Sequence, residues 1–322
     1  QFNCPLLVHS YLLLLIILHS KMRYFILFIS LFLMSCEEVV TLDSPQSNHY
    51  LVVEATLTNL PGPQKIVLTQ SQDYFDNTAV PPIKGAEVIV RDDASNEFRF
   101  TESAENPGTY VWVPSVAKPQ FGQVGRNYQL SVKAGNDVFI ASAMMNPVPP
   151  IDSIAYKTAT ANPRQAGEGK PKEGFEARWF ANDLKGEGSS YRLKYYKNGV
   201  LFNAPSNLVI FYDSALQKVA GTDGLMFNLP IRAAINPELY VANDKVKVEL
   251  YSISVDQFSF YSQARLELNN AGLFSRPAAN IPTNIKNTNA ASSMQGAGWF
   301  GVSAVSSLET TIDPAKARKN MP

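Results

Sequence analysis

Cysteine and histidine are nearly missing from this chain. Its 322 residues include two cysteines and three histidines, which all lie in the first 49 residues: Cys4, His9, His19, Cys36 and His49. Zinc sites, cysteine–histidine nucleophile pairs and serine–histidine–aspartate triads each need such a side chain near the reacting atoms. The sequence after residue 49 contains none, so we predict that the protein is not an enzyme, and we predict no catalytic residue, metal or cofactor.

A surplus of positive charge is also missing. Lysine plus arginine and aspartate plus glutamate each number 28, which gives a formal net charge of zero. A neutral chain has no overall field that would attract it to nucleic acid, so no nucleic-acid partner is expected. Hydrophobic residues make up 45% of the sequence, which is ordinary for folded protein, and the length allows two hydrophobic cores.

The first 35 residues have the composition of a targeting segment. Two apolar runs, residues 11–18 and 24–34, are separated by Lys21, Met22 and Arg23. The simplest interpretation is that translation begins at Met22 and that residues 1–35 combine upstream sequence with a lipoprotein signal peptide. The second run is too short to span a bilayer as a mature helix.

The end of this signal, Leu33-Met34-Ser35-Cys36, resembles the lipobox of bacterial lipoproteins. In a lipobox the cysteine is diacylated and becomes the new N-terminus, so we predict Cys36 as the lipid attachment site and residues 36–49 as a lipidated tether. Two or more acyl chains anchor a protein stably, whereas one chain is marginal. Glu37 and Glu38 resemble an acidic surface-export signal of Bacteroidota lipoproteins; the alternative is that they are only part of the polar tether.

The sequence after the tether predicts a mainly all-β protein with two β-sandwich domains. Over residues 50–146, short apolar-alternating runs are separated by Gly, Pro, Asn and Asp, as in a sandwich. The run from Gly85 to Val90, a polar turn, a strand and then Gly108-Thr109-Tyr110 resemble transthyretin-like, carboxypeptidase-regulatory sandwiches. An immunoglobulin-like sandwich is the alternative. Val88, Val90 and Tyr110 should face the core by period-two alternation.

A second domain is predicted over residues 147–312, because Pro147, Pro149 and Pro150 cannot continue a sheet interior. Strand-like runs resume after this break, and Asn198-Gly199 suits a type I′ hairpin turn, so we expect a fibronectin-type or immunoglobulin-like sandwich.

One helix is predicted near Asp256–Ala271 of this second domain. Ser254 begins a capping sequence, apolar residues follow at helical spacing, and Gly272 would end the helix. Residues 313–322 form a polar tail that we expect to be mobile.

Two sets of acidic residues have a functional and a structural interpretation. Asp92-Asp93 and Asn182-Asp183 contain fragments of a calcium loop, but they lack its full acidic spacing, so turns are favoured. A pair of carboxylates for acid–base work is the other option, but spacing along the chain does not select two of them. The candidates for such a pair are Glu173, Glu176, Asp183, Glu187 and Glu249.

Aromatic and basic residues in the predicted strands also have a functional and a structural interpretation. Six aromatic residues would form a carbohydrate-stacking platform if they were exposed together, but alternate aromatics in strands are more often core. They are Trp112, Trp179, Trp299, Tyr195, Tyr196 and Tyr212. The scattered strand cations, interpreted as solvated faces, are Lys65, Arg91, Arg99, Lys194 and Lys197.

Taken together, several segments resemble a family of Bacteroidota lipoproteins known as domain of unknown function 4249. The segments that carry the resemblance are the lipobox at Cys36, residues 51–55, Gly85-Ala86, residues 147–154, Pro282-Thr283-Asn284-Ile285 and residues 296–301. The resemblance implies an outer-membrane, lipid-anchored protein at the cell surface, associated with TonB-dependent receptors. We therefore expect a non-enzymatic accessory protein that binds a ligand or partner. A carboxylate-type glycoside hydrolase and a structural or adhesive envelope protein are the alternatives.

Overall fold

The computed structural model describes residues 49–73, 76, 78–162, 169–185, 188–204, 208–212, 226–230, 238–270 and 279–320, with the backbone alone for 226–230. All of these residues belong to one unit of the chain, residues 46–322.

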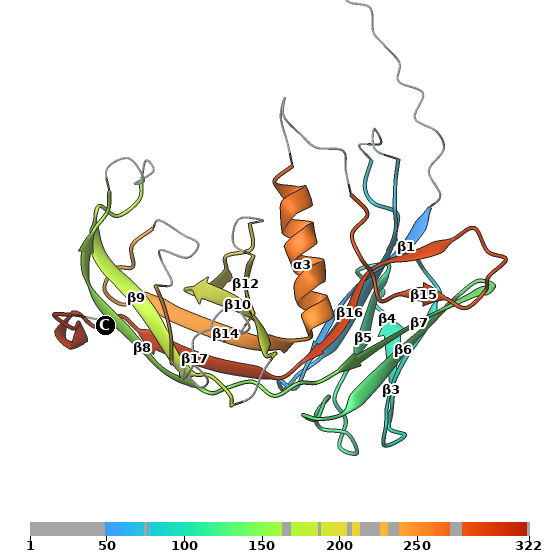
Figure 1. Ribbon diagram of the computed structural model, residues 1–322, viewed down its shortest axis with the longest axis horizontal. Coiled ribbons are helices and arrows are strands. Elements are labelled where there is room, and N and C mark those ends of the chain that lie inside the picture. The colour runs from blue at the N-terminus through green and yellow to red at the C-terminus, as the bar shows by residue number, and fades with distance from the viewer. Residues whose placement is uncertain are drawn as a thin grey trace, which may run out of the picture. The chain divides into compact units, whose positions relative to one another are not determined.

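A nine-stranded sheet forms the first part of the fold (Figure 1). Its strands are β1 (Tyr50–Thr58), β2 (Gln64–Gln70), β3 (Glu87–Asp92), β4 (Glu97–Glu102), β5 (Thr109–Trp112), β6 (Asn127–Ala134), β7 (Asp137–Met144), β15 (Lys286–Asn287) and β16 (Gln295–Ser303). The spatial order is β15-β7-β6-β3-β4-β5-β2-β1-β16. Neighbouring strands are antiparallel except β1 and β16, which are parallel.

Alternating burial along these strands explains why the sheet folds over on itself. In β1, every second residue of Leu51–Leu57 is at most 3% exposed, whereas Glu54 between them is exposed. Val88, Val90 and Tyr110 lie in the same core, as predicted. A sheet with one apolar face must cover that face, and here the nine strands cover it by enclosing one core.

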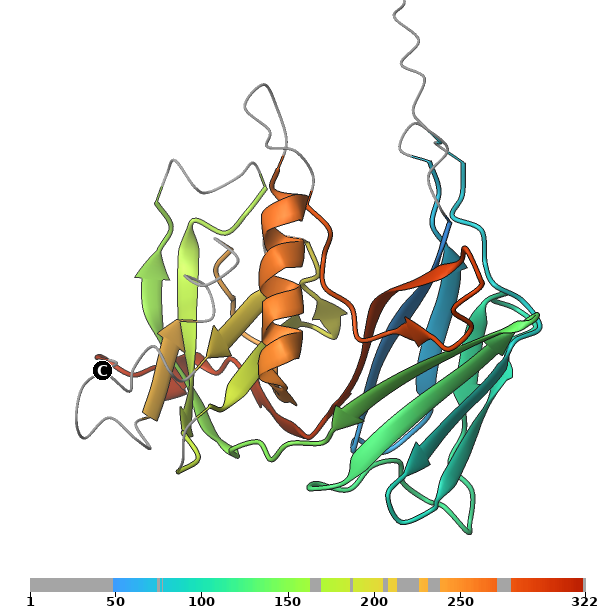
Figure 2. The same ribbon diagram turned by 45° about the vertical axis from the view of Figure 1, so that its right-hand side comes forward.

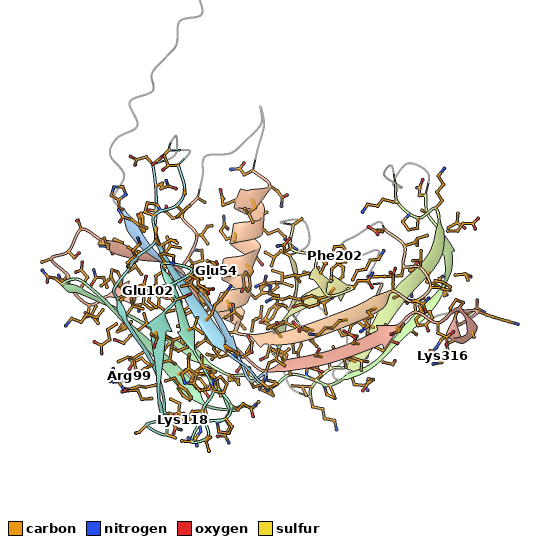
Figure 3. All side chains as sticks on the ribbon, turned by 180° about the vertical axis from the view of Figure 1, so that it is seen from behind. Glu54, Arg99, Glu102, Lys118, Phe202 and Lys316 are labelled. Carbon is orange, nitrogen blue, oxygen red and sulfur yellow. The ribbon has the colours of Figure 1, made fainter. Side chains whose placement is uncertain are left out.

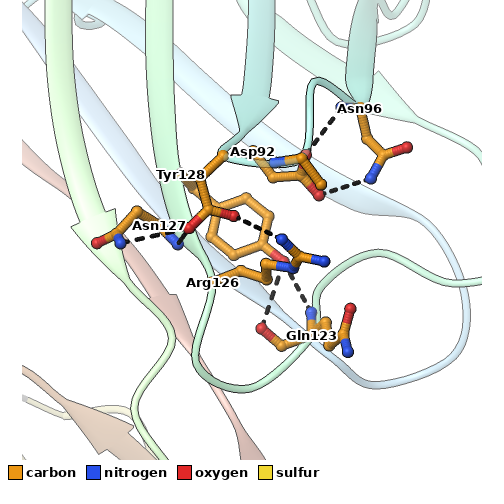
Figure 4. A network of polar contacts seen from close by, with 8 residues as sticks. Asp92, Asn96, Gln123, Arg126, Asn127 and Tyr128 are labelled. Carbon is orange, nitrogen blue, oxygen red and sulfur yellow. Dashed lines mark hydrogen bonds and ion pairs between the residues drawn. The ribbon is translucent and has the colours of Figure 1, made fainter.

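Tyr128 fixes the loop that precedes β6. Its side chain is buried, and its hydroxyl accepts a hydrogen bond from the backbone N–H of Gln123 at 2.7 Å (Figure 4). A tyrosine near the start of a strand that bonds to backbone a few residues upstream is the tyrosine corner of immunoglobulin-like sandwiches. This contact favours the immunoglobulin-like description of the first sandwich over the transthyretin-like one.

The strand β16 returns to this sheet from the far end of the sequence. It pairs with β1 along its whole length, from Tyr50 opposite Gln295 to Thr58 opposite Ser303. It also contacts β7 and β15, which stand at the other end of the strand order. The two edges of the sheet are thereby brought together, which protects strand edges from unwanted pairing. The division into residues 50–146 and 147–312 stays a prediction. It assigns β15 and β16 to the second segment of the chain, although both strands belong to the first sheet.

Asn284 joins the two ends of the strand order. Its side-chain amide donates to the carbonyl of Phe300 at 2.7 Å and accepts from the N–H of Phe300 at 3.0 Å. The same amide lies 3.4 Å from the carbonyl oxygen of Ser142 on β7. Because these bonds satisfy the backbone as a neighbouring strand would, the segment Pro282-Thr283-Asn284-Ile285 has a structural role.

Two glycines let other parts of the chain approach β16 closely. A Cβ at Gly298 would overlap the carbonyl of Val53 on β1, and the φ angle of +79° is in the left-handed region. A Cβ at Gly301 would overlap the side-chain amide of Gln257 on the helix α3 (Val255–Leu268). Glycine has no Cβ, so packing explains both of these positions in the segment 296–301.

Two smaller sheets enclose a second core (Figure 2). One has the order β11-β10-β14-β17, with β12 also paired to β10, and the other has the order β13-β9-β8. The strands are β8 (Ile151–Thr160), β9 (Glu173–Asn182), β10 (Ser190–Lys197), β11 (Val200–Leu201), β12 (Val209–Tyr212), β13 (Met226–Pro230), β14 (Lys245–Ile253) and β17 (Val305–Thr311). This core is rich in aromatic side chains, including Trp179, Tyr191 and Tyr195.

The predicted fold class is confirmed, since the described residues are mostly strand with a single α-helix. The Asn198-Gly199 turn is confirmed as well: both residues have positive φ, 52° and 81°, and the turn joins β10 to β11. The interval between β7 and β8 contains Pro147 to Pro150, where the sequence predicted that strand structure stops.

The start of α3 agrees with the sequence. The Ser254 hydroxyl caps the helix by accepting a hydrogen bond from the N–H of Gln257 at 3.1 Å. The predicted end was wrong, because the helix stops at Leu268 and Asn269 is its C-cap. Gly272, the predicted stop, lies outside the described residues.

The apolar residues at helical spacing identified the helix, but they do not form a buried stripe along α3. Leu268 is 58% exposed, and Gln257 is the one buried residue of this helix. The helix instead contacts its neighbours through aromatic rings, with Phe258 beside Tyr212 of β12 and Phe260 beside Trp299 of β16. Phe260, one of the apolar residues at helical spacing, makes such a ring contact, whereas Leu268 at the same spacing does not pack into a core.

Part of the polar tail has a defined structure. Asp313 caps the short 3-10 helix η3 (Pro314–Lys316) by accepting from the N–H of Ala315 at 3.0 Å. The N–H of Arg318 donates to the carbonyl of Tyr156 on β8 at 2.8 Å. These bonds fix residues 313–318, for which the sequence had suggested a mobile tail.

Replacing Gly298 by alanine should lower the free energy of unfolding by about 3 kcal/mol or more, because both the backbone conformation and the contact with Val53 oppose a Cβ. Gly125→Ala is the matched control, since φ there is +86° but nothing lies within 4 Å of the added Cβ. The control should cost only about 1 kcal/mol, the strain term alone. Urea unfolding measures the loss of stability in both variants. Equal losses would show that the close approach of Val53 on β1 does not require glycine at position 298.

Candidate functional site

The predicted lipid attachment site Cys36 and the predicted export residues Glu37 and Glu38 lie outside the described residues. Glu187, one of the five candidate carboxylates, lies outside them too.

The pair Asp92-Asp93 forms a turn. Asp92 accepts hydrogen bonds from the N–H of Asn96 at 2.8 Å and from its side-chain amide at 2.8 Å (Figure 4). Asp93 accepts from the N–H of Asn127 at 3.1 Å and from Arg126 at 3.1 Å. The backbone bond from Asn127 is the main cause that lowers the pKa of Asp93. The turn interpretation is confirmed, because these oxygens are used in holding the loops at the ends of β3 and β6.

Asn182-Asp183 is also occupied by local bonds. The Asn182 amide donates to Asp152 at 3.0 Å, and Asp183 accepts from the hydroxyl of Tyr191 at 2.9 Å. Over the residues that the structure describes, no group of three or more His, Cys, Asp or Glu side chains is placed to hold a metal ion.

The candidate carboxylates are not gathered at one place. Glu173 is exposed at the start of β9, and Glu176 on the same strand lies 3.6 Å from Arg178. Glu249 belongs to β14 in the other small sheet. The structure therefore selects no acid–base pair from this set among the described residues.

The six aromatic residues divide into two groups. Trp112 lies in the first core, and Trp179 and Tyr195 lie in the second, so the core interpretation is right for these three. The others, Tyr196, Tyr212 and Trp299, belong to neither core. They lie on separate strands, β10, β12 and β16, so the six do not form one platform.

A pocket of about 490 Å³ lies beside the first turns of α3. Four separate segments line it: β7, α3, residues 282–286 including the start of β15, and β16. The lining residues are Ile140, Ala141, Ser142, Asp256, Ser259, Pro282, Thr283, Asn284, Lys286 and Trp299. Its volume is in the range of small-molecule sites.

Some polar groups in this pocket are used by the fold, and others are available. Asn284 closes the sheet, and Thr283 donates to the carbonyl of Gly298 at 2.8 Å. The Asp256 carboxylate and the Lys286 ammonium make no side-chain hydrogen bond or ion pair with any residue that the structure describes. The pocket therefore offers one negative and one positive group, from different segments, beside the mostly buried Trp299 ring.

A second polar region is the side of the β10–β14 pair that faces away from the core. We call it the β10/β14 outer face; its residues are Arg192, Lys194, Tyr196, Lys247, Glu249 and Tyr251. They form three directly opposed pairs: Arg192 with Tyr251, Lys194 with Glu249, and Tyr196 with Lys247. Residues at alternate positions of the same strands, such as Leu193 and Leu250, point into the second core.

Glu249 is the carboxylate at the centre of this face. It is 4% exposed and accepts hydrogen bonds from Tyr251 at 2.7 Å, from Tyr196 at 2.8 Å and from Lys247 at 2.6 Å. Burial raises the pKa of this carboxyl, but the bonds from Lys247 and the two hydroxyls outweigh burial and hold the pKa below its ordinary value. Glu249 is therefore ionised and fully engaged.

Lys194 lies next to this carboxylate without pairing to it. Its ammonium lies 4.4 Å from the centre of the Tyr251 ring, a cation–π contact. Burial, reinforced by the charge of Arg192, lowers the pKa of Lys194 to about 8, while Glu249 and Glu54 act in the opposite direction. The prediction of a fully solvated strand cation is wrong here.

Lys197 also departs from the solvated interpretation. Its ammonium donates to Glu238 at 2.7 Å and lies 3.2 Å from Asp244, and its side chain is 15% exposed. Burial lowers the pKa of this lysine, but the two carboxylates outweigh burial and raise the pKa above its ordinary value. Arg91 and Arg99, in contrast, are exposed, as predicted, and each forms an ion pair with Glu97.

Sequence reasoning missed Arg192, Tyr251, Asp256, Tyr261 and Lys286. Period-two alternation in residues 190–197 indicates a polar face, but it does not show that β14 and α3 partly bury that face. Nothing in the spacing brings Asp256 and Lys286 to one pocket, because 286 − 256 = 30 positions separate them along the chain.

Fold and site together define an all-β protein with one helix beside a polar pocket. The chain matches the model of the family described as Domain of unknown function (DUF4249) over residues 37–309, and it belongs to that family. The predicted family is thus confirmed. No curated protein matches the chain. In the part of the chain that the structure describes, no helix has the length and apolar character needed to cross a membrane.

Glu249→Gln should lower the free energy of unfolding at neutral pH by about 2–3 kcal/mol. This loss is smaller than that expected for breaking a fully buried ion pair, because the Lys247 side chain is 35% exposed to solvent. The folded-state pKa of Glu249 is lowered, so its contribution is present above the unfolded value of 4.5 and is lost as pH falls through the folded value. Urea unfolding should show that the difference in free energy of unfolding between variant and wild type is smaller at acidic pH than at neutral pH.

The control for this measurement is Glu309→Gln. That side chain is 48% exposed and lies 3.9 Å from Lys245, so its loss should change stability by less than about 0.5 kcal/mol. A pH-independent effect of Glu249→Gln would mean that ionisation of this carboxyl does not stabilise the fold.

Proposed function

We propose that this chain is a non-enzymatic accessory lipoprotein of the outer membrane that binds a small polar ligand beside a TonB-dependent receptor. Cys36 carries the lipid, and Glu37 and Glu38 direct the protein to the cell surface. The observation that carries the binding role is the pocket beside α3, in which Asp256 and Lys286 are not engaged by other described side chains.

The anchoring part of the proposal rests on the sequence. Leu33 to Cys36 has lipobox form, and the polar tether leads directly into β1 at Tyr50. A tether that enters β1 would attach the lipid to a strand that is paired on both sides. The Bacteroidota setting and the receptor partner follow from the family resemblance.

The binding part of the proposal rests on the arrangement of charges in the pocket. A carboxylate and an ammonium on opposite segments suit a ligand that carries both signs of charge, or one with several hydroxyl groups. Trp299 would contribute an apolar surface for the ligand's carbon atoms. Its ring packs against Phe260 of α3, with 5.2 Å between the ring centres, and this contact holds it in place.

Replacing Cys36 by alanine should abolish lipid labelling and move the protein from the membrane to the soluble fraction, or leave its signal uncleaved. The reason is that an acylated cysteine holds an otherwise net-neutral chain at the bilayer. Metabolic labelling with a fatty acid and fractionation in alkaline carbonate measure this. A Cys36→Ala protein that stays membrane-bound after signal removal would contradict the anchor.

The export assignment has its own variant. Changing both Glu37 and Glu38 to alanine should leave lipid labelling intact but reduce digestion by protease added to whole cells. Unchanged digestion would show that the two residues are only part of the tether.

The double variant Asp256→Asn with Lys286→Gln should bind the pocket ligand at least about tenfold more weakly, because each substitution removes a charge and keeps a polar side chain. Free amino acids and monosaccharides serve as probes, and calorimetric titration gives the dissociation constants. The matched control is Lys245→Gln with Glu309→Gln, an exposed pair on β14 and β17 that lies outside the pocket. Two outcomes would count against the pocket. One is that the probes bind the pocket variant as tightly as wild type, and the other is that no probe binds wild type.

A further inference from the structure

Two cations on the β10/β14 outer face have no counter-charge of their own. Arg192 and Lys194 are two positions apart on β10, so they project to the same side of the strand, with their Cα atoms about 7 Å apart. The one carboxylate of this face, Glu249, is already bonded to Lys247 and to two tyrosine hydroxyls. Three positive groups and one negative group thus share a partly buried surface.

The donors of these two cations are mostly unused. Arg192 donates one N–H to the hydroxyl of Tyr261 on α3 at 2.8 Å and stacks on that ring, with 4.7 Å between guanidinium carbon and ring centre. A guanidinium has five N–H donors and an ammonium has three. Lys194 makes no hydrogen bond or ion pair with the residues that the structure describes, only its contact with the Tyr251 ring.

The aromatic partners keep both cations in fixed positions without neutralising them. A ring face attracts a cation, but it accepts no N–H bond of the strength that an oxyanion would accept. Both side chains remain partly exposed, so a solute can reach them. The surroundings are less polar than water, which strengthens the attraction of an uncompensated cation for an anion.

The other charged groups near Lys194 do not cancel the surplus. Glu54 on β1, labelled in Figure 3, and Lys65 on β2 affect its pKa with opposite signs. Arg192 on the same strand adds positive charge, and Glu249 on β14 is already engaged by its own donors. Burial raises the pKa of the Tyr251 phenol, so this neighbour stays neutral.

We propose that Arg192 and Lys194 bind the phosphate group of a small soluble ligand, or another compact dianionic oxyanion. Two cations fixed side by side match a dianion in charge, and the Tyr261 hydroxyl beside Arg192 supplies a further polar contact. This site is distinct from the pocket beside α3, with which it shares no lining residue, so it extends the proposed function and does not depend on it.

The test uses the full protein and two probes, inorganic phosphate and sulfate, in calorimetric titrations at constant ionic strength. Wild type should bind both. Lys194→Met and Arg192→Met should each weaken binding by about tenfold or more, since each removes one of two charges. Lys133→Met is the matched control and should leave binding unchanged. Lys133 is an exposed lysine on β6 of the nine-stranded sheet.

A pH series separates this site from general salt effects. Sulfate stays dianionic between about pH 7 and about pH 9, so any change in its affinity belongs to the protein. Binding needs the Lys194 ammonium, so wild-type affinity should fall as pH rises through about 8, the pKa of this group, and Lys194→Met should lose this dependence.

Three results would overturn the proposal. The first is no measurable binding of either probe by wild type, and the second is equal binding by wild type and all three variants. The third is binding to phosphatidylglycerol vesicles through Lys194 without any binding of free phosphate or sulfate, which would assign the site to a membrane surface. Circular dichroism of each variant checks that it is folded, and Arg192→Lys keeps the test informative if Arg192→Met does not fold.

Discussion

The parallel pairing of β16 with β1 is the constraint on which the rest of the structure depends. It joins residues 295–303 to residues 50–58, so the chain must finish most of its path before the first sheet can close. Contacts this distant in sequence carry a high loop-closure cost, which the first core must offset. The same strand carries Trp299 on its outer side and Gly301 against α3, so the helix and the pocket take their positions from it.

Much of the first sandwich could be predicted because its strands alternate in sequence as they alternate in burial. Val88, Val90 and Tyr110 followed directly from the period of two. The pairing of β16 with β1 could not be predicted in that way, since residues 295–303 contain three glycines and their spacing does not indicate a partner strand. A Cβ at Gly296 would overlap Ile285, and Cβ atoms at Gly298 and Gly301 would overlap Val53 and Gln257, which are distant along the chain. Local pattern identifies strands, but it does not identify their partners.

The candidate sites show the same limit more strongly. Alternation placed Lys194 on the polar side of its strand, which is correct, but the interpretation as solvated failed because Tyr251 and Glu249 come from β14 and partly enclose it. For Asp92-Asp93, in contrast, the turn interpretation held, because its hydrogen-bond partners are mostly local or at the adjacent strand end. Burial of a charge depends on tertiary neighbours, so sequence predicts its side of a strand better than its pKa.

The helix α3 is the element through which the two candidate sites are linked. Asp256 and Ser259 in its first turns line the pocket, and Tyr261 of the same helix contacts Arg192 of the β10/β14 outer face. Between them Phe258 and Phe260 contact β12 and β16, so the helix is fixed by rings rather than by an aliphatic stripe. Gln257 is the one buried residue among the 14 residues of this helix, so its position depends on these ring contacts. The same ring contacts therefore position both Asp256 in the pocket and Tyr261 beside Arg192.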